Sequence, residues 1–375
     1  MDCSSVVNDQ WEYVLSLLPD DLEASALAKL AIRRRREIAS ASDLLRVALA
    51  YSVCDFSLRQ TAAWAQMSGL GHLSDVAVLK RLRGAGEWLG HVVLRCLHDR
   101  GLAAGRIARR VRVVDATVVS RPGSEGTDWR LHLGLDLEAC RILSFELTGV
   151  EGGETLRRCA LDSDDVVLAD RGYSTVPGVA SVLDRQGHIV VRLHWRAFPL
   201  KSESGKALDV GAALETLAVG EVADWPVRFR HGRRAYRMRL IAMRKSTAST
   251  EREQRKVRYE ASRKGRRVTA QSLQAAGFIV LLTDLSQDLL PAVEALELYR
   301  LRWQIEIAFK RLKSLLNLDR LRAKTPALAR TYLYGKLLAA ILLDDLCDRL
   351  PAFSPWGFPL LPQTRQFLAI AATLA

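Results

Sequence analysis

Three carboxylates in this chain lie in segments that could bring them to one place. Asp115 follows the apolar run VRVV and Asp170 follows VVLA, which puts both at the predicted ends of buried strands. Glu306 lies far downstream, in the segment 299–313, YRLRWQIEIAFKRLK. Two strand aspartates and one helical glutamate supply the oxygen ligands that a two-metal phosphoryl-transfer site requires. An aspartate at a strand end is also a common turn or cap residue, so this interpretation depends on the three side chains converging.

The segment around Glu306 has the periodicity of an amphipathic helix. At 100° per residue, Tyr299, Arg302, Glu306 and Lys313 fall within roughly a 60° arc. The polar stripe combines one carboxylate with two cations and a phenol, and it borders a buried face. Arg302 and Glu306 could also be an ordinary i, i+4 ion pair on an exposed helix. The apolar arc beside the stripe comprises Leu298, Leu301, Ile305, Phe309 and Leu312.

The spacing of this stripe resembles the Y-R-E-K signature of DDE transposases of the insertion-sequence-four group. The segments around Asp115 and Asp170 resemble that family's other two acidic motifs, and the three motifs occur in the family's order. The resemblance implies an enzyme that cleaves transposon ends and transfers the freed strands to target DNA, by cut-and-paste through a hairpin intermediate. It also implies that Asp115, Asp170 and Glu306 hold two Mg²⁺ ions, for which Mn²⁺ can substitute.

The residues around the triad are candidates for DNA contact. Arg302 and Lys313 could hold phosphates that flank the scissile bond, and Tyr299 could donate a hydrogen bond to one. Arg171, directly after Asp170, matches the DR pair of the family and is a further phosphate candidate. The partners that the resemblance implies are double-stranded DNA, as terminal inverted repeats and as target, and a second copy of the chain in a homodimeric synaptic complex.

The order of the predicted elements indicates an α/β fold with a ribonuclease H-like catalytic core. From about residue 112 the pattern predicts three strands, a helix, a strand, a helix and a strand. Ligands gather at the carboxyl ends of strands in such sheets, so Asp115 and Asp170 can meet if their strands are neighbours. We expect a helical N-terminal DNA-binding domain (1–105), the core in two parts (106–195 and 276–350), a basic β-rich insertion (196–275) and a C-terminal tail (351–375).

The N-terminal hundred residues predict helices at 10–18, 22–36, 41–54, 58–66, 74–83 and 87–98. The segments SLRQTAAWAQ and SDVAVLKRLR, separated by MSGLGHL, could form a helix-turn-helix whose second helix presents Lys80, Arg81 and Arg83 to DNA. The turn is longer than in the standard motif, so a helical bundle with a solvated basic edge is the alternative. The family resemblance favours DNA contact.

Charge is concentrated in one region. The 375 residues carry a formal net charge of +13, from 55 basic and 42 acidic side chains. Residues 226–267 contain sixteen Lys or Arg against three Glu, which accounts for the whole excess. This distribution favours a polyanion bound by that region. The alternative is a solvated, flexible surface, with the N-terminal helices carrying DNA binding.

Several site classes are disfavoured by the sequence. The six cysteines form no CxxC or Cys/His cluster, which argues against zinc or disulfides and favours a reducing cytoplasm. The N-terminus has no signal-peptide pattern, and the apolar run LLAAILL is too short to span a bilayer. We therefore expect a soluble, cytoplasmic bacterial protein. His132, on a predicted core strand, is expected to be a structural histidine.

Two competing hypotheses share the same fold. One is a non-catalytic DNA-binding derivative of a transposase, against which the intact Asp115, Asp170 and Glu306 argue. The other is a structure-specific nuclease that cuts without joining strands. The Y-R-E-K stripe and the basic segment favour transposition over the nuclease.

Overall fold

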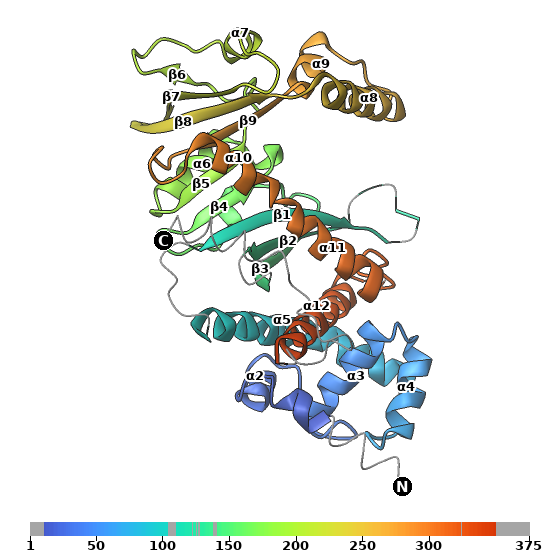
Figure 1. The fold of residues 1–375 in the computed structure, drawn as a ribbon. Coiled ribbons are helices and arrows are strands. Elements are labelled where there is room, and N and C mark those ends of the chain that lie inside the picture. Colours follow the sequence, from blue (N-terminus) through green and yellow to red (C-terminus); the bar gives the residue numbers. More distant parts are fainter. Residues whose placement is uncertain are drawn as a thin grey trace, which may run out of the picture.

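The computed structural model describes residues 11–349 except 104–109, 122, 125, 127, 138–140 and 324. The expected tail, 351–375, lies outside these residues. The fold is built on one nine-stranded mixed sheet, with the order β3-β2-β1-β4-β5-β9-β8-β7-β6 (Figure 1). The strands are β1 (Val111–Val119), β2 (Trp129–Asp136), β3 (Arg141–Thr148), β4 (Val166–Ala169), β5 (His188–Arg192), β6 (Lys201–Ser202), β7 (Val222–His231), β8 (Arg234–Arg244) and β9 (Phe278–Thr283).

The first five strands have the pairing that a ribonuclease H-like core requires. Strands β1, β2 and β3 are antiparallel neighbours, while β4 pairs in parallel with β1 on one side and β5 on the other. All four residues of β4 are buried, as expected of a continuous apolar run in the middle of a sheet. The basic segment adds β7 and β8 to the same sheet through β9, so its strands extend the core sheet rather than form a second one.

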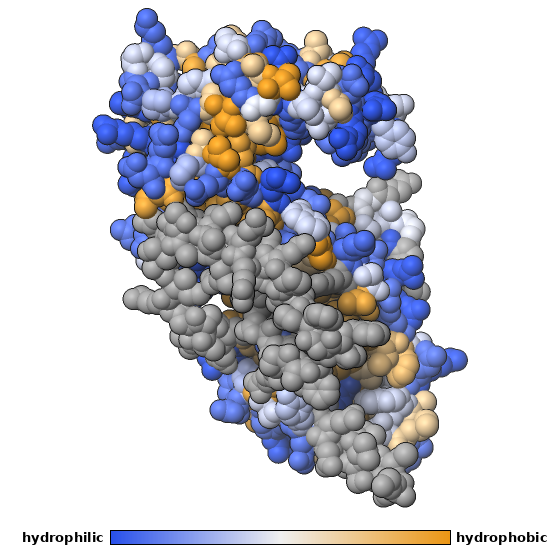
Figure 2. Space-filling view, in the orientation of Figure 1, coloured by the Kyte–Doolittle hydropathy of each residue, from blue (hydrophilic) through white to orange (hydrophobic). Residues whose placement is uncertain are grey.

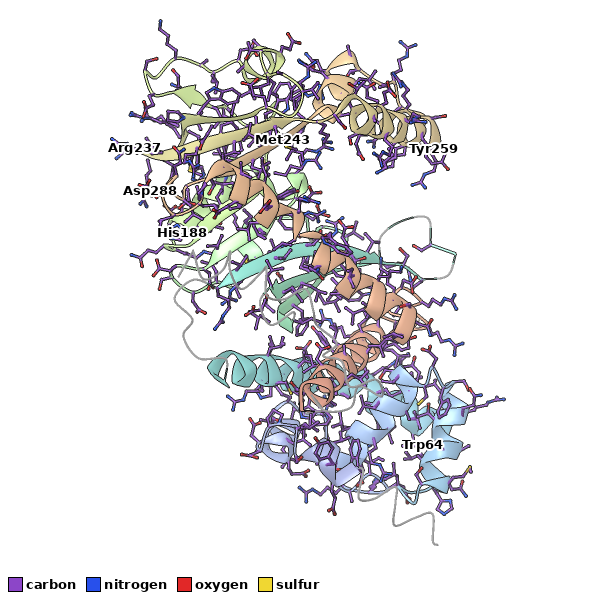
Figure 3. The ribbon with its side chains drawn as sticks, in the orientation of Figure 1. Trp64, His188, Arg237, Met243, Tyr259 and Asp288 are labelled. Atoms are coloured by element: carbon purple, nitrogen blue, oxygen red, sulfur yellow. The ribbon has the colours of Figure 1, made fainter. Side chains whose placement is uncertain are left out.

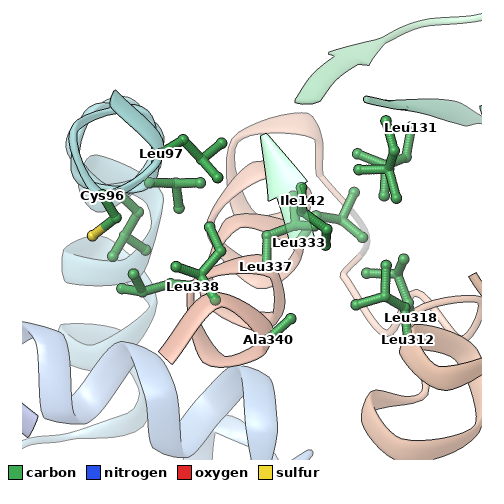
Figure 4. Packing of buried hydrophobic residues seen from close by; sticks show 14 of the residues in the cluster. Cys96, Leu97, Leu131, Ile142, Leu312, Leu318, Leu333, Leu337, Leu338 and Ala340 are labelled. Atoms are coloured by element: carbon green, nitrogen blue, oxygen red, sulfur yellow. The ribbon is translucent and has the colours of Figure 1, made fainter. Parts of the chain in front are cut away.

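Helices cover both faces of the sheet. Apolar residues of α5, α11 and α12 pack with β1, β2 and β3 in one cluster, and those of α6 and α7 pack in a second cluster with β5, β7 and β8. Figure 4 shows Leu333 and Leu337 of α12 close to Ile142 of β3, with Leu97 of α5 facing the same cluster. The helices are α2 (Leu22–Ala28), α3 (Ala41–Val53), α4 (Leu58–Met67), α5 (Asp75–Ala103), α6 (Val176–Leu183), α7 (Val210–Glu215), α8 (Thr247–Arg263), α9 (Ala270–Ala276), α10 (Ala292–Arg300), α11 (Trp303–Leu316) and α12 (Pro326–Arg349), with 3₁₀ turns η1 (Leu156–Arg158) and η2 (Arg171–Tyr173).

The predicted helices 41–54 and 58–66 form as α3 and α4, and each begins with a capping box. Ser40 and Ser57 each accept a hydrogen bond from a backbone N–H three residues on, and the residue there bonds back to complete a capping box. The predicted helix 22–36 is wrong beyond Ala28, because Leu30 adopts a left-handed conformation with φ 56° and stops the helix.

The predicted helices 74–83 and 87–98 form one helix, α5, across the glycines between them. Tertiary packing explains the continuity, because α12 lies against this stretch. A Cβ added at Gly86 would lie 3.2 Å from the Cβ of Arg330, and one added at Gly90 would lie 3.0 Å from the Tyr334 ring. These glycines therefore allow the two helices to approach closely without ending α5.

The helix predicted after the third core strand, at 154–161, is only the short turn η1. Helix α10 begins after Pro291. The charged run after residue 246 is the helix α8. Its N-cap is Ser246, which accepts a hydrogen bond from the backbone N–H of Ser249. The basic segment therefore presents its charge on defined elements.

Candidate active site

Asp115 and Asp170 lie side by side at the edge of the sheet where β4 ends. Strands β1 and β4 run parallel, and their last paired positions are Val114 and Ala169. The next residue on each strand is the aspartate, so the two are neighbours across the sheet. Asp170 follows the end of β4 as predicted. The prediction that Asp115 ends its strand is wrong, because β1 continues to Val119 through its pairing with β2.

The segment that carries Glu306 is two helices joined by a tight turn. Helix α10 ends at Arg300 and α11 begins at Trp303, so a single helix over 299–313 is also wrong. The N–H groups of Leu301 and Arg302 bond to carbonyls three residues back, at 3.0 and 3.1 Å. This 3₁₀ geometry keeps the right-handed course of the chain. Side chains before and after the turn therefore still reach the same site.

Tyr299 and Arg302 join the three carboxylates into one network. The Tyr299 hydroxyl donates to Asp170 Oδ1 at 3.1 Å. The Arg302 guanidinium lies 2.5 Å from Glu306 Oε1 and 3.6 Å from Asp115 Oδ2. It also lies 5.9 Å from the centre of the Tyr299 ring. The i, i+4 pair of Arg302 and Glu306 is thus present, and the same guanidinium extends it to the strand aspartate.

The surroundings of Asp115 disfavour its negative charge. Burial, chiefly, and the nearby charges of Asp170 and Glu154 raise the pKa of Asp115 to about 6. The N–H of Ala116, which donates at 2.8 Å, and the Arg302 guanidinium oppose this shift. A cation bound beside Asp115 would offset this shift, because it would favour the ionised carboxylate.

Sequence reasoning missed Glu154 and Arg192. Glu154 lies between β3 and η1, and its Oε2 would be 2.5 Å from a Cβ added at Gly172, two residues after Asp170. Arg192 ends β5, and its charge acts on Tyr299 by lowering the pKa that burial and Asp170 raise. The only sequence signal for Glu154 is an acidic residue after a glycine pair, which is too common to identify a site.

Of the other predicted contacts, Arg171 and Lys313 lie near the triad. Arg171 begins η2 and lines a hollow together with Asp170 and Glu154. Lys313 is half-buried on α11, roughly 10 Å along the helix from Glu306. Within the described residues it forms no ion pair with the three carboxylates.

The helix-turn-helix candidates lie on α5 among the N-terminal helices, apart from the carboxylates (Figure 1). Lys80 and Arg83 are exposed, but Arg81 is half-buried and donates to the Arg34 carbonyl at 2.7 Å. Arg81 therefore has a structural partner in addition to its predicted role. His132 is buried and its Nε2 lies 3.0 Å from Thr148 Oγ1, as expected of a structural histidine.

The three carboxylates do not form a closed group of ligands. In the part of the chain that the structure describes, no three Asp, Glu, His or Cys side chains are grouped closely enough to bind a metal. Glu306 is turned toward Arg302, and its side chain is 57% exposed, so it can rotate without disturbing the core.

Among the residues that the structure describes, no helix is long and apolar enough to cross a membrane.

A family model described as "Transposase DDE domain" matches residues 106–342, which include all three carboxylates. The chain belongs to the DDE transposases. This transposase is 39% identical over 357 residues to the putative transposase InsL of insertion sequence element IS186A from Escherichia coli K12, covering 93% of this chain and 96% of the relative. It is equally similar, over 358 residues, to the transposase of insertion sequence element IS421 from Escherichia coli.

More distant similarity extends to other elements. The transposase of IS231F from Bacillus thuringiensis is 26% identical over 268 residues, which cover 63% of this chain and 56% of that protein. A cryo-EM structure of the piggyBac transposase synaptic complex with hairpin DNA aligns with a TM-score of 0.45 and 10% identity, over 96% of this chain and 77% of that one. The predicted membership of the insertion-sequence-four group is confirmed. The transposase is thus an enzyme of DNA transposition.

Proposed function

We propose that this transposase cleaves the terminal inverted repeats of its element and joins the freed 3′ ends to target DNA, with Asp115, Asp170 and Glu306 as catalytic carboxylates. The observation that carries the proposal is the network in which Tyr299 and Arg302 link all three side chains. The chain's ribonuclease H-like strand order supports it, since that order makes β1 and β4 neighbours.

The donor set fits divalent metal ions. Carboxylate oxygens are the ligands that Mg²⁺ prefers, and adjacent strands bring Asp115 and Asp170 to roughly 5 Å in the sheet. Burial and the like charges nearby disfavour the ionised form of Asp115, and a bound cation would offset that cost. Asp115, Asp170 and Glu306 would hold two Mg²⁺ ions, or Mn²⁺ in their place. When bound, such ions stabilise the charge that develops on the attacking and leaving oxygens.

The chain's own cations prepare this site. Arg302 holds Asp115 and Glu306 in place by ion pairing, and a guanidinium can exchange a carboxylate for a phosphate with the same geometry. Tyr299 orients Asp170 through its hydroxyl. Lys313, on α11, and Arg171, directly after Asp170, are suited to neighbouring phosphates. On substrate binding, Arg302 would therefore turn to DNA and release Glu306.

Helix α8 is suited to bind the duplex. The end of β8 pairs with the start of β9, at the sheet edge where β5 ends, so α8 begins on the same edge as the catalytic carboxylates. Figure 2 shows the surface hollowed below α8, between this helix and the part that carries β1. The face of α8 turned away from α9 is exposed, and within roughly a 100° arc it carries Arg252, Arg255, Lys256, Tyr259 and Arg263.

The other basic residues of 226–267 lie elsewhere. The turn that joins β7 to β8, at residues 231–234, is at the opposite edge of the sheet. Figure 3 places Arg237 and Tyr259 at opposite ends of this half of the molecule. We therefore propose that α8 and the basic residues after it, and not the hairpin, hold the duplex; this part of the chain is called the DNA clamp below. Lys80 and Arg83 remain candidates for contacts to the terminal repeats.

The partners of the proposed reaction are duplex DNA and a second copy of the chain. Two element ends must be held together for cut-and-paste movement, and a homodimer supplies one active site for each. The reaction would take place in the bacterial cytoplasm, where the DNA is.

Nicking and strand transfer on terminal-repeat DNA with Mg²⁺ test the proposal. Glu306→Gln should abolish nicking while gel-shift affinity stays near wild type, because phosphate contacts rather than the carboxylate supply affinity. Glu297→Gln, an exposed glutamate on the neighbouring α10, is the matched control and should nick normally. Wild-type nicking by Glu306→Gln would remove Glu306 from the mechanism. Nicking by the wild type without joined products would favour the nuclease.

A further inference from the structure

Asp55, in the loop between α3 and α4, is bound by side chains from the other end of the sequence. It adopts a left-handed conformation, with φ 55°. Its Oδ1 accepts hydrogen bonds from the Tyr332 hydroxyl and from Lys336 Nζ, the latter at 3.1 Å. Its Oδ2 accepts from Asn317 Nδ2 at 3.3 Å, and its backbone carbonyl accepts from Arg322. One loop residue thus contacts both α12 and the turn that follows α11.

Asp55 is the carboxylate that pairs with the buried ammonium of Lys336. Lys336 is on α12, and its side chain is 0% exposed. A buried ammonium is costly unless it is paired with a carboxylate and fully hydrogen-bonded. Asp55 supplies that carboxylate, and the Leu316 carbonyl at the end of α11 accepts a second hydrogen bond from the same Nζ. The Tyr332 ring, 4.6 Å from Nζ, completes the surroundings. The buried charge therefore ties the loop, α11 and α12 to one point.

The turn held in this way links α11, which carries Glu306, to β1, which carries Asp115. Asn317 caps α11 in a left-handed conformation, with φ 47°. Three residues later, Arg320 forms a parallel bridge with Ser120, directly after β1, and its carbonyl lies 3.0 Å from the Tyr332 hydroxyl. Figure 4 shows Leu312 and Leu318 packed on the same side of this turn. The end of α11 is thus fixed both to the β1 strand and to the Asp55 loop.

We propose that Asp55 is a positioning residue: by holding the end of α11 against α12 and β1, it sets where Glu306 lies relative to Asp115. The inference rests on the proposed function, in which Glu306 is catalytic. A helix moves as a nearly rigid body, so a shift at Asn317 is carried to Glu306, three turns earlier. The loop leads directly into α4, capped by Ser57, so α4 and the catalytic helix share one anchor.

The test is Asp55→Asn, which keeps the size and the tolerance of positive φ but removes the charge. Misplacement of a catalytic group by about 1 Å can cost about a hundredfold in rate. We expect the nicking rate constant at saturating DNA to fall by tenfold to a hundredfold, with the DNA Kd changed by less than about twofold. Amide hydrogen exchange of residues 312–318 should become faster.

The matched control is Asp165→Asn. Asp165 also forms a largely buried ion pair, with Arg112 at 2.5 Å, but lies at the amino end of β4, roughly 16 Å along the strand from Asp170. This variant should lower stability without lowering the nicking rate of folded protein. A loss of nicking as large as that of Asp55→Asn would overturn the inference, since general destabilisation would then explain both.

Two further variants separate position from folding. Asp55→Asn with Lys336→Met removes the buried charge together with its partner, so it should fold yet still nick slowly. Asn317→Gly keeps the left-handed turn and removes only the amide bond to Asp55, and we expect a smaller fall in nicking. Wild-type nicking by folded Asp55→Asn or by the double variant would refute the inference. If Glu306→Gln also nicked normally, the proposed function itself would fail. If Glu306→Gln were inactive, the proposed function would stand and only the role of Asp55 would be refuted.

Discussion

Neutralising the outer face of α8 should weaken DNA binding in a way that salt reveals. The variant is Arg252→Gln, Arg255→Gln and Arg263→Gln, three exposed residues on one face of α8 that form no ion pair within the described part of the chain. Lys256 is left unchanged because it pairs with Glu253 at 2.8 Å. Since the three guanidinium groups form no ion pair within the described residues and α8 begins on the sheet edge that carries the catalytic carboxylates, we expect each to contact one phosphate.

The magnitude follows from counterion release. Each neutralised phosphate contributes roughly 0.9 to the slope of log affinity against log salt on duplex DNA. Three lost contacts should therefore lower that slope by about 2.7. A fourfold increase in salt lowers the affinity of both proteins, and the factor by which it does so should be about 40-fold smaller for the variant than for the wild type. Gel-shift or fluorescence titrations of terminal-repeat DNA at several salt concentrations measure the slope.

The control removes the same charge from the opposite edge of the sheet. Arg230→Gln, Arg233→Gln and Arg237→Gln also take the net charge from +13 to +10, being three fewer positive charges, but they lie on or beside the β7–β8 turn. We expect the salt slope of this variant to stay within about 0.5 of the wild-type value. Equal reductions in both variants would mean that net charge, and not the α8 face, controls binding. An unchanged slope in the α8 variant, with the protein still folded, would refute the clamp.

Three further predictions concern the site and the core. Tyr299→Phe removes the hydroxyl that donates to Asp170, so nicking should fall by about tenfold with unchanged gel-shift affinity; an unchanged rate would exclude that hydrogen bond from the mechanism. Burial, chiefly, and the charges of nearby arginines lower the pKa of His132 to about 4. Because the unfolded chain binds this proton below about pH 6.5, folding stability should fall as the pH drops from 6.5 to 4, by about 2 kcal/mol at pH 5. Urea unfolding of His132→Gln at pH 7.5 and 5 should show a smaller fall, and equal falls would contradict the assignment. Gly90→Ala should destabilise by about 1–3 kcal/mol, since its Cβ would meet Tyr334 at 3.0 Å, whereas Gly84→Ala, with nothing within 4 Å, should stabilise by about 0.5–1 kcal/mol in the same assay.

The sequence alone determined the candidate triad and the order of the core elements. Asp115 and Asp170 follow apolar runs long enough to be recognised as buried strands, and Glu306 lies in a helical periodicity. Helix starts at Ser40 and Ser57 were also predictable, because a capping box involves residues only three apart. These features depend on close neighbours in the chain, which is why one sequence is enough to infer them.

The tertiary structure decided the features that depend on distant partners. Strand β1 continues past Asp115 because β2 pairs with it, and α5 continues past Gly86 because α12 packs against it. Glu154 reaches the site only through the course of the loop after β3. Residues 226–267 form one block of charge in the sequence, but the hairpin fold divides that charge between two edges of the sheet. Such contacts join residues tens to hundreds of positions apart, and no local pattern specifies which of them will meet.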